Sequence, residues 1–221
     1  MIDARAHISI DDITFVLQRL SANGYDSIYD DKLFRYLRIL HRLFGLKITL
    51  YIFAKYGEWS IETMPDVYKH EFSLASDWLK LGLHAISEKQ KQNNILNEFE
   101  NQYLQSKQQV LHFASQKSLT QIIRLHYWFY PQIYLDVLSK EGVRTILTKE
   151  KQNIKTNLDI WETNIRIESC PIGAVVRKIF SHSDKQPLVI FTHEWALNQR
   201  TQFKMLIVVL MVKLRGYKFV C

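Results

Sequence analysis

Cysteine is scarce in this chain, and its scarcity excludes two kinds of architecture. Only Cys170 and Cys221 occur among the 221 residues. Two cysteines form neither a disulfide framework nor a thiolate metal cluster. So few cysteines are typical of a protein from a reducing compartment. The chemistry of this chain must therefore be sought among its other side chains.

The sequence also lacks the apolar segments that target or anchor a protein. Residues 1–5 show neither the charged start nor the apolar run of a signal peptide. The longest late apolar run, residues 205–212, is far shorter than the roughly 20 residues of a membrane span. We therefore expect a cytoplasmic protein without a membrane span.

No internal repeat or linker interrupts the chain, so we expect a single domain over residues 1–221. Apolar residues make up 47% and aromatic residues 13% of the sequence, which is ordinary for a globular protein. A chain of this length buries one sizeable core without needing a second.

The charge is basic, with a formal net charge of +7 and a pI near 9.3. The Lys and Arg residues are scattered along the sequence, and the densest stretches, residues 88–91 and 149–151, contain acids. No recognisable nucleic-acid-binding motif is present. The charge therefore predicts a solvated basic surface, and we expect no nucleic-acid partner.

Strand-like and helix-like segments alternate along the chain with short connections. The predicted strands are residues 6–12, 46–53, 78–84, 120–128, 143–148, 188–193 and 217–220. The predicted helices are residues 13–20, 30–44, 65–72, 89–117, 131–142 and 197–214, and residues 153–172 are expected to form a loop or a short strand. This alternation predicts an α/β protein, either a parallel sheet or a barrel with fewer than eight full units.

Several of the apolar strand segments run into polar side chains. Asp11 and Asp12 follow the first segment, and His84, His126 and His193 follow three later ones. Because the carboxyl ends of parallel strands meet at one face, we expect these side chains to form a metal and acid–base centre. Each has a structural alternative. The Asp pair would cap the following helix, and a histidine that ends a strand is often a hydrogen-bonded structural residue.

Charged neighbours extend this candidate centre. Glu88 lies four residues after His84, so a helical or tightly turned segment would let both side chains bind one ion. Arg124 is a candidate to orient one of the Asp carboxylates. Glu194 either sets the tautomer of His193 or caps the last helix.

Aromatic residues follow Arg124 in the sequence. Tyr127 and Trp128 are candidates to stack on the face of a sugar, and packing in the core or at its rim is the alternative. Trp195 occupies a similar place after His193.

Together these segments resemble the NodB-type polysaccharide deacetylase superfamily, in particular a subgroup of short, divergent deacetylase-like proteins. The resemblance covers nearly the full length and is closest over residues 8–87. It implies a distorted, incomplete (β/α) barrel of mostly parallel strands.

The first family motif, Thr-Phe-Asp-Asp-Gly, corresponds to Ser-Ile-Asp-Asp-Ile at residues 9–13, with Ile13 in place of the glycine. The resemblance implies that Asp11 is the catalytic base and Asp12 a metal ligand. The second motif, His-Ser/Thr-x-x-His, corresponds to residues 84–88. His84 is thereby implied as a ligand, and Glu88 stands where a second histidine is expected.

The third family motif, Arg-x-Pro-Tyr, corresponds to Arg124-Leu125-His126-Tyr127. The resemblance implies that Arg124 orients the base and that the Tyr127 amide contributes to an oxyanion hole. His126 replaces the family proline, so either His126 or Glu88 supplies the third metal ligand. The last motif, Leu-x-His, corresponds to residues 191–193 and implies that His193 is the general acid.

The resemblance implies a metal-dependent hydrolase that removes acetyl groups from a carbohydrate by cleaving an amide or ester bond. Its cofactor would be a divalent ion, zinc foremost, with cobalt, nickel or iron as alternatives. The rival hypothesis is a catalytically inactive carbohydrate-binding or scaffold relative, with an aromatic cleft around Trp59, Trp128 and Trp195.

Overall fold

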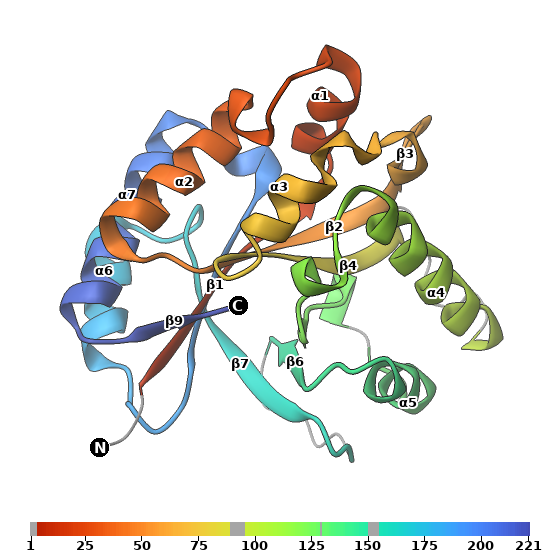
Figure 1. The fold of residues 1–221 in the computed structure, drawn as a ribbon. Helices are drawn as coiled ribbons and strands as arrows, with labels where there is room; N and C mark the ends of the chain where they lie inside the picture. The colour runs from red at the N-terminus through yellow and green to blue at the C-terminus, as the bar shows by residue number, and fades with distance from the viewer. Residues whose placement is uncertain (1–3, 89–95, 129, 150–154) are drawn as a thin grey trace.

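The computed structural model describes residues 4–88, 96–128, 130–149 and 155–221. A curled sheet runs through the molecule, and helices lie around its outside (Figure 1). The strands are β1 (Arg5–Ile13), β2 (Ile48–Tyr56), β3 (Trp59–Ser60), β4 (Leu79–Ser87), β5 (Ile122–Ile123), β6 (Thr145–Thr148), β7 (Asp159–Arg166), β8 (Leu188–His193) and β9 (Lys218–Val220). The α-helices are α1 (Phe15–Asn23), α2 (Lys32–Phe44), α3 (Lys69–Leu74), α4 (Leu96–Phe113), α5 (Gln132–Lys140), α6 (Ile172–Ser181) and α7 (Gln199–Leu214).

The sheet has the strand order β3-β2-β1-β8-β7-β6-β5, with β4 also paired to β2 and β9 to β1. The short hairpin between β2 and β3 is antiparallel, and the other pairings named here are parallel. The sheet curls until β4 approaches the segment before β5, where the Thr120 N–H donates to the Leu81 carbonyl at 2.9 Å. The predicted distorted, incomplete (β/α) barrel is thereby confirmed.

The helices begin and end largely where local signals place them. At the start of α2 the Asp31 carboxylate accepts a hydrogen bond from the Leu33 N–H, and at its end Gly45 adopts a left-handed conformation with φ 72°. Apolar residues on the inner face of α2, including Leu37, are buried against the sheet. Within the described residues, no helix combines the length and the apolar character that crossing a membrane requires.

The barrel interior holds a small cluster separate from the main core between sheet and helices. The cluster comprises Tyr51, Ile122, Leu147, Trp161 and Val189. The Tyr51 ring fills the space next to β4, so a Cβ at Gly82 would come within 2.7 Å of it. Glycine is therefore needed at this position of β4 because of a close approach, not because of a turn.

His7 of β1 is buried in the same interior. Its Nδ1 lies 3.3 Å from the Val220 carbonyl oxygen, and its Nε2 lies 3.3 Å from the Tyr51 hydroxyl. Burial, and secondarily the positive charge of Arg124, lower the pKa of His7 to about 3, against a weaker opposing effect of the Val220 carbonyl.

This buried histidine predicts a stability loss in mild acid. Between pH 6.5 and 3 the unfolded chain binds a proton that folded His7 does not, so stability is fully present above pH 6.5 and falls as the pH is lowered. On going from pH 7 to pH 5, we expect wild type to lose about 2 kcal/mol more unfolding free energy than His7→Asn. Urea titrations at the two pH values measure this, with exposed His112→Asn as the control. Equal losses in wild type and His7→Asn would contradict the prediction.

Three sequence expectations need correction. Residues 153–172 are expected to form a loop or a short strand; a strand is present there, but β7 is eight residues long and lies in the middle of the sheet. Residues 120–128 form only the two-residue strand β5, followed by a kinked turn. The strand β1 runs through Ile13, so the helix expected at 13–20 begins later, at Phe15. Part of the helix expected at 89–117, residues 89–95, lies outside the described residues.

Candidate metal centre

The end of β1 is distorted where the Asp pair lies. The β1–β2 register shifts between Ile10 and Ile13, and Asp12 has a positive φ of 59°. Aspartate is one of the few non-glycine residues that tolerate this conformation. Successive side chains of a regular strand point to opposite faces, and the irregularity at Asp12 breaks that alternation. Asp11 and Asp12 consequently have different partners.

Asp12, His84 and His126 converge on one point. The Asp12 Oδ1 lies 3.3 Å from His84 Nε2 and 3.8 Å from His126 Nδ1, and the two nitrogens are 3.2 Å apart. One ligand atom from each residue falls within a 4.8 Å span. Ligands at about 2.1 Å from a tetrahedral zinc ion are about 3.4 Å from each other. The three observed separations therefore fit a divalent ion.

The backbone sets the tautomer of His84. Its Nδ1 lies 2.6 Å from the Arg124 carbonyl oxygen, which accepts and cannot donate, so this nitrogen carries the proton. The lone pair of Nε2 then points toward Asp12 and His126. Such an outer hydrogen bond is the usual support of a metal-binding histidine.

His126 has the protonation state that a ligand needs. Burial, together with the nearby His84 and His193, lowers the pKa of His126 to about 4, and Asp12 only partly opposes this. The imidazole is therefore neutral at pH 7. Among the described residues, its buried Nε2 has no hydrogen-bond partner.

Asp12 is ionised because its neighbours favour the charged carboxylate. Burial raises the pKa of this carboxyl, but His84, His193 and the indole of Trp195 more than offset burial and hold the pKa below its usual range. Histidine nitrogens and a carboxylate oxygen form a donor set that suits zinc and related divalent ions.

Glu88 is not part of this group. The segment after His84 continues as strand β4 through Ser87, and Glu88 is exposed in the turn that follows. In a strand, four residues span about 13 Å, so the two side chains do not share the helical spacing considered from the sequence. Of the two alternatives for the third ligand, the geometry favours His126.

Asp11 lies apart from the Asp12 group, in a buried ion pair with Arg124. The Ser9 hydroxyl donates to Asp11 Oδ1 at 3.0 Å, and Arg124 Nη1 donates to Asp11 Oδ2 at 3.1 Å. Asp11 and Arg124 are each only 1% exposed, so this ion pair is shielded from water. Arg124 therefore contacts the carboxylate that the family resemblance implies to be the base.

His193 is oriented by Glu168, which the sequence reasoning missed. The His193 Nδ1 lies 2.5 Å from Glu168 Oε1, and Arg166 Nε donates to the same oxygen at 2.7 Å. Burial raises the pKa of Glu168, but hydrogen bonds, the one from His193 foremost, lower it to about 2. The remaining nitrogen, His193 Nε2, lies 3.9 Å from Asp12 Oδ2, so His193 borders the centre.

Glu194 neither sets the tautomer of His193 nor caps the last helix, the two roles that the sequence suggests for it. Its carboxylate accepts hydrogen bonds from the backbone N–H groups of Thr14, Phe15 and Val16 at 2.6 to 2.8 Å. Glu194 thus caps α1 across 180 residues of sequence, and Asn198 caps α7 instead. The alternative in which Asp11 and Asp12 cap the helix after β1 is also wrong for this reason.

The aromatic residues divide into packed and exposed ones. Trp128 is half-buried with Arg124 Cζ 4.7 Å from its ring, and it follows Tyr127 in a turn where both have positive φ. Tyr127 and Trp195 are 57% and 60% exposed. Trp195 stacks on His193 and donates its indole N–H to Asp12 Oδ2 at 3.1 Å, so it covers one side of the centre. Trp59 lies in β3, where its indole N–H donates to Ser21.

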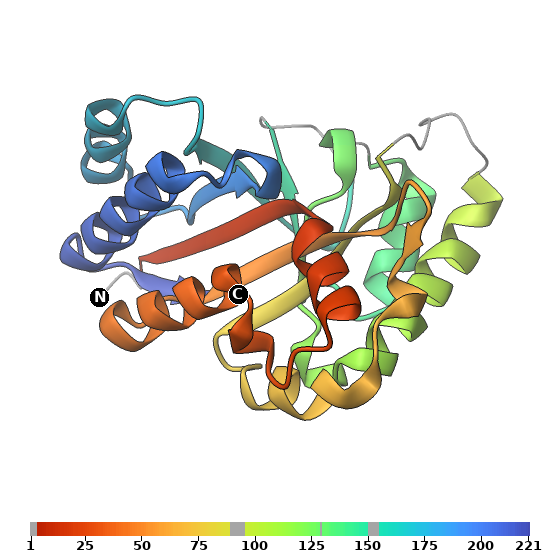
Figure 2. The ribbon, with the colours of Figure 1, turned by 90° about the horizontal axis from the view of Figure 1, so that it is seen from above.

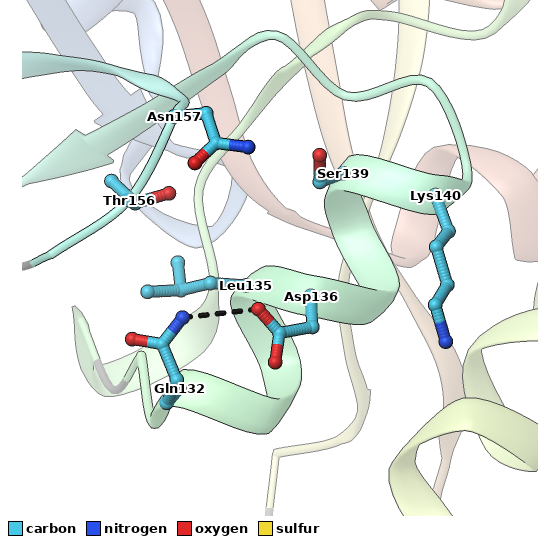
Figure 3. A pocket seen from close by; sticks show the side chains of 7 residues that line it. All are labelled: Gln132, Leu135, Asp136, Ser139, Lys140, Thr156 and Asn157. Atoms are coloured by element: carbon cyan, nitrogen blue, oxygen red, sulfur yellow. Dashed lines mark hydrogen bonds between the residues drawn. The ribbon is translucent and has the colours of Figure 1, made fainter.

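A separate surface pocket lies between α5 and residues Thr156 and Asn157 (Figure 3). Its lining is largely polar, and Gln132 and Asp136 form a hydrogen bond at its edge at 3.0 Å. The residues that line it include no member of the Asp12 group and no partner of Asp11 or His193. The pocket is therefore a feature apart from the centre.

Comparison with known proteins bears on the fold. No protein-family model and no curated protein matches the sequence. Among solved structures, a peptidoglycan N-acetylglucosamine deacetylase is similar, with a TM-score of 0.62 and 14% identity over 99% of this chain and 86% of that one.

Two further structures show the same similarity. A family 4 carbohydrate esterase from Streptomyces lividans, in complex with acetate, gives a TM-score of 0.55 at 12% identity over 96% of this chain and 88% of its own. A family 4 acetyl xylan esterase from Clostridium thermocellum, in complex with a cobalt ion, gives 0.57 at 13% identity over 97% of this chain and 86% of its own. The fold that the sequence resemblance implies is thus confirmed: this chain shares the fold of these carbohydrate deacetylases and esterases.

Proposed function

We propose that this chain is a metal-dependent hydrolase that removes acetyl groups from a carbohydrate. The observation that carries the proposal is the convergence of Asp12, His84 and His126 within 4.8 Å beside the buried Asp11–Arg124 pair. The solved structures with this fold are named as deacetylases and esterases, which supports the same class of reaction.

Asp12, His84 and His126 would hold the ion. Bound there, a divalent ion supplies Lewis-acid polarisation of the acetyl carbonyl and lowers the pKa of water. The Nδ1–H of His84, bonded to the Arg124 carbonyl, keeps the ring fixed for this task. The chemistry of the donor set favours zinc, with cobalt, nickel or iron as alternatives.

Asp11 and His193 would each carry out one proton transfer, and Tyr127 would stabilise the oxyanion. Asp11, held by Ser9 and Arg124, would accept a proton from the attacking water. The backbone N–H of Tyr127 would donate to the developing oxyanion. His193 would protonate the departing amine or alcohol from Nε2, because Glu168 holds its Nδ1.

Exposed aromatic surfaces border this arrangement and suit a sugar ring. Trp195 and Tyr127 present open faces, and the positive charge of Arg166 lies 5.8 Å from the Trp195 ring. Trp128, whose ring lies 4.7 Å from Arg124 Cζ, would mainly support Arg124 and contribute less to the sugar site.

The test is acetate release from acetylated xylan and from N-acetylglucosamine oligomers, before and after removal of metal with a chelator. We expect release that the chelator abolishes and added Zn²⁺ or Co²⁺ restores. Purified protein that retains its metal and releases no acetate from a broad panel of acetylated saccharides would instead favour the inactive binding relative.

A further inference from the structure

Three helices, α2, α6 and α7, contain no aspartate or glutamate. They carry nine cationic residues, four in α2, two in α6 and three in α7: Lys32, Arg35, Arg38, Arg42, Arg177, Lys178, Arg200, Lys204 and Lys213. The formal net charge of the whole chain is +7, so the rest of the chain carries −2. Nine of the 29 Lys and Arg residues therefore lie on three helices that carry no acidic residue.

The three helices lie side by side. The Tyr36 hydroxyl of α2 donates to the Gln202 carbonyl of α7 at 2.7 Å, and α6 packs against the other side of α7. Both views of the molecule show α2, α6 and α7 along one flank (Figures 1 and 2). We call the outward surface of these three helices the basic apolar face.

Large apolar side chains are exposed on two of the same helices. Phe203 and Leu214 of α7 are 63% and 65% exposed, and Leu43 of α2 is 68% exposed. The helix α7 buries Met205 and Val212 on its inner side, yet Phe203 and Leu214 continue the apolar character on its outer side. A helix that is apolar all round normally has a second partner on its outer face.

The charge decides between possible partners. Seven of the nine cations, all except Arg38 and Lys204, are exposed. A two-fold dimer through this face would bring like charges of the two copies together, which is unfavourable. A nucleic acid would satisfy the cations but not the exposed Leu43 and Leu214. Apolar side chains flanked by Lys and Arg are the pattern of surfaces that bind anionic lipid.

We propose that the basic apolar face binds the surface of an anionic phospholipid bilayer. Leu43, Phe203 and Leu214 enter the headgroup region, and the surrounding cations contact lipid phosphates. This peripheral binding uses no residue of the Asp12 centre and does not depend on the proposed hydrolase activity.

Vesicle co-sedimentation tests the proposal with the whole chain. We expect wild type to bind vesicles of equal parts phosphatidylglycerol and phosphatidylcholine, and not vesicles of phosphatidylcholine alone. Each cation removed should weaken binding about fivefold, so R42Q/R200Q/K213Q should lower the partition coefficient about a hundredfold. L43S/F203S/L214S should lower it at least tenfold while leaving the salt dependence in place.

Matched controls change exposed residues elsewhere: K69Q/K117Q/K140Q for charge and V67S/L74S for apolar surface. Both should bind like wild type, and circular dichroism checks that every variant is folded. The proposal is overturned if wild type ignores phosphatidylglycerol vesicles, or if the controls lose as much binding as the face variants. It is also overturned if sedimentation shows a wild-type dimer that L43S/F203S/L214S dissociates, or if duplex DNA binds and vesicles do not.

Discussion

Asp11→Asn is expected to lower acetate release about a thousandfold while leaving the metal content unchanged. The substitution keeps the size of the side chain and its ability to accept a hydrogen bond from Arg124, but it removes the basic carboxylate. Asp11 lies outside the group of Asp12, His84 and His126, so the loss should fall on proton transfer and not on metal binding.

Asp159→Asn is the matched control, because Asp159 is an exposed aspartate at the start of β7. It should retain wild-type activity and metal. Loss of metal together with activity in Asp11→Asn would reassign Asp11 as a ligand. Retention of activity would remove it from the reaction altogether.

Glu194→Ala is expected to destabilise the fold by at least about 3 kcal/mol. Three backbone N–H groups at the start of α1 lose a buried, charged acceptor, and each such unsatisfied donor costs about 1 to 3 kcal/mol. The positive end of the helix dipole also loses its counter-charge. Urea unfolding of the variant and of exposed Glu58→Ala gives the comparison.

Glu194 also links the segment after β8 to the segment after β1. It follows His193 directly in the sequence, and its partner Thr14 lies two residues after Asp12. A Glu194→Ala variant that unfolds at the same urea concentration as Glu58→Ala would show that this cap contributes little.

Much of the centre follows from the sequence because parallel strands end at one face. The sequence places Asp11, Asp12, His84 and His193 after apolar segments. Asp11, Asp12 and His193 lie at or near the ends of β1 and β8, whereas His84 joins them from within β4, which continues to Ser87. The sequence predicts His126 within a strand over residues 120–128. It reaches the group from the turn after β5 instead, so the residue is predicted correctly and its local structure is not.

The partners of these residues were harder to predict. Glu168 follows β7, whose residues alternate weakly between apolar and polar, so the sequence left both a loop and a short strand open there. A strand recognised there would have placed Arg166 and Glu168 beside His193. Glu194 caps a helix 180 residues away, a contact that no local pattern encodes.

The sequence also predicts the wrong local structure for residues 126–128. Aromatic residues favour strands, which made Tyr127 and Trp128 look like the continuation of β5. Positive φ values at both residues form a kinked turn there instead, and the Trp128 ring lies 4.7 Å from Arg124 Cζ. Tertiary packing outweighs local propensity at this site.

The metal content of purified wild type and of His84→Ala, measured by elemental analysis, tests the central claim most directly. We expect about one zinc, cobalt, nickel or iron ion per wild-type chain, its loss in His84→Ala, and its retention in exposed His112→Ala. A metal-free wild-type protein that also fails to take up added metal would contradict the assignment of Asp12, His84 and His126 as a metal centre.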